Sequence, residues 1–172
     1  LVLAAYVALL IAFIPGDLPL GVGFSRAGTV AAAALVAACS AIAAARRIRE
    51  FAAFIRGSFR TVLACETLFL AAFTLMLGVR SQVPQITYVI GDSAAEKFTD
   101  FATLNGLLTS VHFPPHSTWA AGLSMNYYYF GHFMWATLVR LTGVAPEVGY
   151  NLALASAFAL VCVGSLGIGY NL

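Results

Sequence analysis

The chain has 172 residues, of which 61% are hydrophobic and 9% are charged, and its mean hydropathy is +0.90. Soluble domains usually carry about 25% charged residues, so this composition excludes an ordinary soluble domain and predicts an integral membrane protein surrounded by membrane lipids. The formal net charge of +2 is too small to indicate a nucleic-acid partner.

Long apolar runs predict an all-α, polytopic transmembrane helix bundle, because about 20 apolar residues are needed for a helix to cross a bilayer. The predicted spans lie near residues 1–14, 28–45, 61–79, 120–141 and 148–172. The first is too short alone, and it lacks the basic start and the cleavage pattern of a signal peptide, which is the alternative reading. Since the chain starts without Met and both of its ends are apolar, we expect a single-domain fragment, residues 1–172, of a larger bundle.

The segment 46–60 carries most of the basic residues and therefore sets the predicted topology. The positive-inside rule places this segment in the cytoplasm and the loop 81–124 outside, with Arg140 at the cytoplasmic end of the fourth span. Within it, apolar residues recur at helical spacing opposite the arginines, as in a helix that lies in the headgroup layer. A role in topology and lipid anchoring is favoured over a regulatory or partner site. These apolar residues are Ile48, Phe51, Ile55 and Phe59.

Glu66 lies inside the predicted span 61–79, where a carboxylate is costly and usually has a partner or a function. A structural ion pair with Arg60, or with an arginine before it, is favoured over a proton or ion pathway. Three cysteines also fall within apolar spans, and we interpret them as packing residues, not as a disulfide framework or a zinc site. These are Cys39, Cys65 and Cys162.

The interval from Gly91 to His132 concentrates the polar residues, including all three histidines. Its Ser93–Glu96 segment has the form of a capping box and predicts a short surface helix over about 94–107. Glu96 and Asp100 share one face of that helix. A capping role explains Glu96 as well as a functional one does, whereas Asp100 has no capping role, so a functional role is favoured for it over a solvated surface position.

Two further groups in this interval are candidates for binding. His112 and His116 flank two prolines that make the segment a rigid turn, and hydrogen-bonding loop roles are favoured for them over a shared metal ion. Trp119 and the triplet Tyr127–Tyr129 match either an aromatic belt at the membrane surface or a platform for a sugar or lipid headgroup, with Asn126 bonding to hydroxyls.

A collinear set of uncommon motifs resembles the YYY membrane protein family, large polytopic proteins named for the tyrosine triplet. The resemblance runs from Glu66 to Leu152, about half of the chain. One departure is that His116-Ser117-Thr118 stands where the family often has an acidic residue, so no role is expected here for that carboxylate. The motifs are Glu66, Phe69, Phe73, Arg80-Ser81, the run from Glu96 to Phe101, Leu104-Asn105, Phe113-Pro114-Pro115, Trp119, Gly122 and the run from Asn126 to Gly131.

The YYY family is similar to the GT-C superfamily of membrane glycosyltransferases, and this resemblance implies a GT-C-like fold and sugar transfer from a polyprenyl-phosphate donor on the outer face of the membrane. It implies an essential acidic residue in the first long external loop, for which Asp100 is the candidate base, with Glu96 beside it. Lys97 and Arg80 are candidates to balance phosphate charge. The substrate-binding candidates are His112, His116, Trp119, Asn126, Tyr127, Tyr128 and Tyr129.

Two other classes of function stay open at the level of sequence. A transporter or lipid-handling protein would use Glu66 and the aromatic cluster without a catalytic base, and a structural subunit of a membrane complex would need neither. No metal-binding pattern is indicated, although a divalent metal is compatible with the chemistry.

Overall fold

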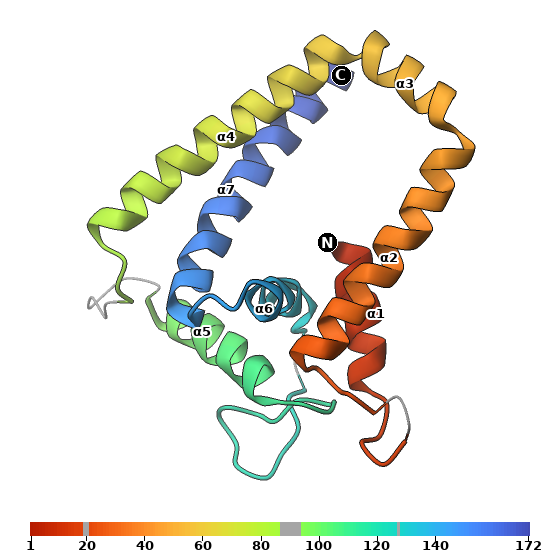
Figure 1. The fold of residues 1–172 in the computed structure, drawn as a ribbon. Helices are drawn as coiled ribbons and strands as arrows, with labels where there is room; N and C mark the ends of the chain where they lie inside the picture. The colour runs from red at the N-terminus through yellow and green to blue at the C-terminus, as the bar shows by residue number, and fades with distance from the viewer. Residues whose placement is uncertain (19–20, 87–93, 127) are drawn as a thin grey trace. The chain divides into compact units, whose positions relative to one another are not determined.

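The computed structural model describes residues 1–18, 21–86, 94–126 and 128–172, and the regular structure in these ranges is helical (Figure 1), as the sequence predicts. The chain divides into two compact units, one of residues 1–39 with 86–150 and the other of residues 40–85 with 151–172. The helices are α1 (Val2–Ala12), α2 (Arg26–Arg46), α3 (Ile48–Gly57), α4 (Phe59–Gln82), α5 (Ala94–Thr109), α6 (Phe130–Thr142) and α7 (Pro146–Asn171).

Helices α2, α4 and α7 are long and apolar enough to cross a membrane, at 21, 24 and 26 residues. A rise of about 1.5 Å per residue makes each of them at least as long as the hydrocarbon core, which is about 30 Å thick. Their side chains are mostly exposed, as expected for helices whose neighbours include lipid. The predicted spans 28–45 and 61–79 lie within α2 and α4, and nearly all of the predicted span 148–172 lies within α7.

The structure differs from the sequence prediction at the span expected over 120–141, because α6 has only 13 residues. At about 1.5 Å per residue it is roughly 20 Å long, too short to cross the bilayer alone. Residues 120–126 lie outside the helix, where Ser117 N–H donates to Leu123 O at 2.9 Å and Met125 N–H donates to Pro115 O at 2.8 Å. Helix α6 ends at Gly143, whose φ of 74° is left-handed.

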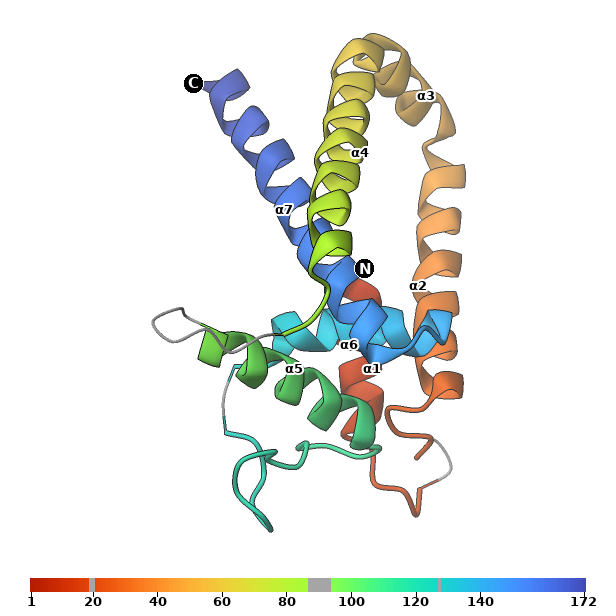
Figure 2. The same ribbon diagram turned by 90° about the vertical axis from the view of Figure 1, so that its left-hand side faces the viewer.

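Helix α6 lies against α1 and α5 in the first unit, and both views show α5 and α6 side by side (Figures 1 and 2). Next to them an aromatic cluster forms around Phe113, whose ring meets four others at centroid distances of 5.4 to 6.0 Å. The backbone N–H of Phe113 donates to Ala12 O at 2.8 Å, so the loop that follows α5 is fixed to the end of α1. The surrounding rings are Phe13, Phe24, Tyr129 and Phe133.

In the second unit, Arg80 joins the end of α4 to the first turns of α7. Its Nε donates to Asn151 Oδ1 at 2.8 Å, and an Nη donates to Pro84 O at 3.0 Å. The Asn151 amide also donates to Pro84 O, at 3.3 Å. Glu66, also in α4, is exposed, and no ion pair to it occurs among the described residues; the expected pairing with Arg60 is therefore not observed.

Candidate functional site

The polar contact at the centre of the candidate site joins Asp100 of α5 to His132 of α6. His132 Nε2 lies 3.1 Å from Asp100 Oδ1, and the two side chains are 27% and 46% exposed. With the ring proton on Nε2, the imidazole donates to the carboxylate and Nδ1 is left without a proton. The pair is partly exposed to solvent and can therefore accept a proton. Helices α5 and α6 fix the positions of its two side chains.

Hydrophobic packing explains why these two side chains meet. Asp100 comes one turn before Thr103 and Leu104 and two turns before Leu107, all buried along α5. His132 comes one turn before Ala136, which is fully buried in α6. Asp100 and His132 thus lie on the same sides of their helices as the buried residues, at the ends where these sides become exposed to solvent.

A second polar contact lies eight residues further along both helices, where an Arg140 Nη donates to the carbonyl oxygen of Leu108. The Arg140 guanidinium also lies 4.9 Å from the centroid of the Phe24 ring, a favourable cation–π position. Burial lowers the pKa of Arg140. The sequence interpretation placed Arg140 at the cytoplasmic end of a span; the structure instead places it against α5, beside the predicted external loop.

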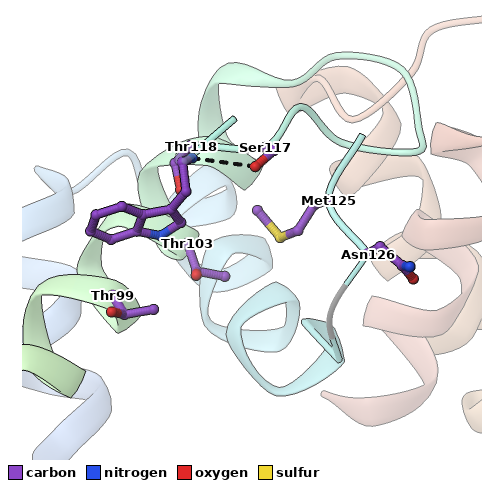
Figure 3. A pocket seen from close by; sticks show the side chains of 7 residues that line it. Thr99, Thr103, Ser117, Thr118, Met125 and Asn126 are labelled. Carbon is purple, nitrogen blue, oxygen red and sulfur yellow. Dashed lines mark hydrogen bonds between the residues drawn. The ribbon is translucent and has the colours of Figure 1, made fainter. Parts of the chain in front are cut away.

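A pocket of about 260 Å³ lies between α5 and the loop that follows it (Figure 3). Ser117 shapes this loop, because its Oγ accepts hydrogen bonds from the N–H groups of Trp119 and Ala120 at 3.3 and 3.1 Å. Figure 3 shows Met125 directed toward Thr103 and Asn126 on the side away from Thr99. The lining residues are Thr99, Thr103, Ser117, Thr118, Trp119, Met125 and Asn126.

This pocket combines hydroxyl and amide groups with apolar surface. Thr99 directly precedes Asp100 in α5, and Asp100 itself is not among the lining residues. The Trp119 side chain is 69% exposed and offers an aromatic face to a ligand. Such a lining suits a small polyhydroxylated ligand with one apolar face, since hydroxyls pair with hydroxyls and an aromatic ring covers C–H groups.

The other predicted site residues are dispersed. Glu96 is exposed in the first turn of α5, and Lys97 follows it. His112 packs against the backbone near Gly16, to which a side chain could not be added without meeting the ring. His116 is exposed, with its backbone N–H bonded to Ser110 Oγ at 3.1 Å.

Within the tyrosine triplet, Tyr128 is 80% exposed, whereas Tyr129 packs against Phe113 and burial raises the pKa of its phenol. Tyr127, like the capping residue Ser93, lies outside the described residues. Arg80 belongs to the other unit, where Asn151 and Pro84 engage it. Among the residues that the structure describes, no three metal-ligating side chains come together.

The sequence interpretation missed His132 and five of the seven residues that line the pocket. His132 ends the run that begins at Asn126, but its 32-residue separation from Asp100 gives no periodic signal. The missed lining residues are small hydroxyl or thioether side chains, which have no distinctive spacing. They are Thr99, Thr103, Ser117, Thr118 and Met125.

Comparison with known proteins gives a family but no characterised relative. Neither a curated protein nor a solved structure shows significant similarity to the chain. Residues 7–172 match the family described as "Uncharacterized membrane protein (DUF2298)". Because this match covers nearly the whole chain, the protein belongs to the DUF2298 family, a YYY-type family of membrane proteins.

Proposed function

We propose that this chain carries the catalytic carboxylate of a GT-C-type membrane glycosyltransferase, which transfers a sugar from a polyprenyl-phosphate donor on the outer face of the membrane. The observation that carries the proposal is the Asp100–His132 contact of 3.1 Å. The neighbouring residue, Thr99, is one of those that line a pocket of about 260 Å³. The likeness of the YYY motifs to GT-C enzymes supports the same assignment.

In the proposed reaction, Asp100 accepts the proton of an acceptor hydroxyl as the hydroxyl oxygen attacks the anomeric carbon of the donor sugar. The new glycosidic C–O bond forms on the face opposite the leaving group. The bond between the anomeric carbon and the phosphate oxygen breaks, and polyprenyl phosphate leaves with the electron pair. His132 holds the carboxylate in position and does not itself contact the substrate.

The pocket supplies the recognition groups for this reaction. Trp119 can stack on the C–H face of a pyranose, and the Asn126 amide can both donate to and accept from ring hydroxyls. Thr103, which is 5% exposed, contributes a hydroxyl from the inner side of the pocket.

The test is sugar transfer from a panel of polyprenyl-phosphate sugars by purified full-length protein. Asp100→Asn keeps the size of the side chain but removes the base, so turnover should fall by about 10² to 10⁴-fold without loss of thermal stability. Asp17→Asn is the matched control, because Asp17 is exposed in the loop after α1 and should leave turnover unchanged. Equal turnover in both variants would remove Asp100 from the mechanism, and an inactive wild type across the panel would favour transport or a structural role.

A further inference from the structure

Helix α3 shows apolar and basic side chains together on an open surface. None of its residues is buried. Ile48, Phe51 and Phe54 are 57%, 56% and 63% exposed. These three positions follow one another at spacings of three residues and therefore lie along one side of the helix. A soluble protein would rarely leave such a side uncovered.

The charged residues of the same segment lie on another side of the helix. Arg49 and Arg56 are seven residues apart, so they project two turns apart from one edge of α3. Glu50 is the single carboxylate of the segment 46–60, and it lies 3.9 Å from Arg47 in a pair whose side chains are 78% and 76% exposed. All five arginines of the segment are exposed: Arg46, Arg47, Arg49, Arg56 and Arg60.

The position of α3 in the chain limits what can cover it. It follows α2 after one residue, Arg47, and precedes α4 after one residue, Ser58. Both neighbours are membrane-span candidates, so α3 is held within a residue of two helix ends and is expected to stay at the membrane boundary. Figure 1 shows α3 and α4 meeting in a bend at this point.

We propose that α3 lies flat in the membrane interface and binds anionic phospholipids, with Arg49 and Arg56 each contacting a headgroup phosphate. Phe51 and Phe54 enter the boundary between headgroups and acyl chains, where apolar area adds to the electrostatic attraction. Guanidinium groups suit this ligand because they form paired hydrogen bonds with phosphate oxygens. Charge complementarity selects anionic over zwitterionic lipid, and this inference does not depend on the proposed enzymatic activity.

The first test compares lipid binding by the purified chain in nanodiscs that contain phosphatidylcholine with either phosphatidylglycerol or no anionic lipid. Spin-labelled phosphatidylglycerol should associate more strongly than spin-labelled phosphatidylcholine. The preference should fall about fivefold for each arginine removed in Arg49→Gln and Arg56→Gln, and further in the double variant. The control is Arg26→Gln, which removes one positive charge elsewhere, as each single variant does, and should keep the preference.

A second measurement tests the position of α3 without relying on those variants. An environment-sensitive dye on Phe54→Cys, in a chain whose native cysteines are replaced by alanine, should show blue-shifted emission and quenching by lipids brominated near the headgroup. Emission typical of water, or equal association of both spin-labelled lipids with the wild-type chain, would overturn the proposal. Dye emission that shifts only when a soluble protein is added would assign the surface to a protein partner.

Discussion

The contact between Asp100 and His132 lies between α5 and α6 where both side chains are partly exposed to solvent, and this exposure weakens their hydrogen bond. A hydrogen bond to a charged group contributes about 1.5 to 3 kcal/mol, and water reduces this at a partly open site. The contact is therefore strong enough to fix the direction of the carboxylate but too weak to hold the two helices together. His132 is accordingly a positioning residue, whereas Asp100 is the proposed catalytic one.

Replacing His132 by alanine should lower kcat about tenfold, because Asp100 keeps its charge but loses the donor that orients it. KM and thermal stability should change little, since the His132 side chain is 27% exposed and lies outside the pocket lining. His132→Gln retains an N–H donor and should recover part of the activity. Steady-state kinetics on the purified enzyme separates these quantities, and an unchanged kcat in the alanine variant would contradict the positioning role.

Arg80, a candidate from the sequence to balance phosphate charge, joins α4 to α7 through its hydrogen bonds to Asn151 and Pro84. Arg80→Gln removes the hydrogen bonds to Asn151 and Pro84, and it should lower the free energy of unfolding by about 1 to 3 kcal/mol. Thermal unfolding in detergent measures this change. Arg26→Gln is the control, because Arg26 is exposed at the start of α2; equal melting temperatures for the two variants would show that the Arg80 contacts add nothing.

At the level of elements, the first turn of α7 packs closely on α6 through a glycine. A Cβ atom added to Gly149 would overlap Cγ2 of Val139. Val139 is 7% exposed, and its branched side chain has one strongly preferred rotamer in a helix, so it cannot easily move aside. Gly164, in the same helix, has no atom within 4 Å of its added Cβ.

Gly149→Ala should therefore destabilise the protein by about 1 to 3 kcal/mol, although alanine is the better helix former. Gly164→Ala carries the same gain in helix propensity without the overlap, and its melting temperature should equal or exceed that of the wild type. Thermal unfolding of the two variants side by side isolates the contact with Val139. A Gly149→Ala protein as stable as Gly164→Ala would show that Gly149 does not lie closely against Val139.

The start of α6 could not be predicted from hydropathy. Residues 120–125 are rich in apolar side chains, so a sliding window extends the helix backwards through them. The residues before Phe130 stay out of the helix because Leu123 and Met125 pair with the backbone of residues 117 and 115 and because Gly122 has a left-handed φ of 77°. Such pairing is a tertiary effect, whereas the helix expected over about 94–107, which the structure shows as α5 (Ala94–Thr109), was predictable because its periodicity is local.

Within the part of the chain that the structure describes, three helices are candidate spans, and they imply a topology that differs from the one expected from the sequence. If α2, α4 and α7 cross the membrane and α6 does not, α5, α6 and the turn after α6 lie on one side, and the end of α7 lies on the same side as residues 46–60. This arrangement keeps the arginine cluster in the cytoplasm. It also explains why Arg140, which binds the α5 carbonyl of Leu108, need not be cytoplasmic.

Cysteine labelling in intact cells tests this topology, in a chain whose native cysteines are replaced by alanine. Ser117→Cys and Ala145→Cys should both react with an impermeant maleimide, whereas Gly57→Cys should react only after permeabilisation. Ala145 is the informative position, because a span over 120–141 would place it inside. Protection of Ala145→Cys alone would restore that span, and protection of Ser117→Cys would reverse the whole orientation.

The sequence was sufficient to predict that the protein is a membrane protein, but it was not sufficient to predict the contact between Asp100 and His132. The composition and the length of the apolar runs identify a membrane protein, because the thickness of the bilayer determines how many apolar residues a spanning helix needs. Asp100 could be proposed as a site residue because no capping role was apparent for it in the sequence. Its partner His132 was not, because their meeting depends on α5 and α6 lying together, and no local pattern encodes contacts between residues 32 positions apart.

The two polar contacts between α5 and α6 share that separation, since both Asp100–His132 and Leu108–Arg140 join residues 32 apart. Helices α5 and α6 consequently run in the same direction. The two contacts are separated by the same number of residues in α5 as in α6. One residue inserted between Asp100 and Leu108 would turn one contact about 100° relative to the other, so only one could survive. Insertions or deletions in the exposed turn around Ala121 should be tolerated, whereas those within α5 or α6 should break one of the two contacts. The site therefore requires this spacing between the contacts as well as the side chains that make them.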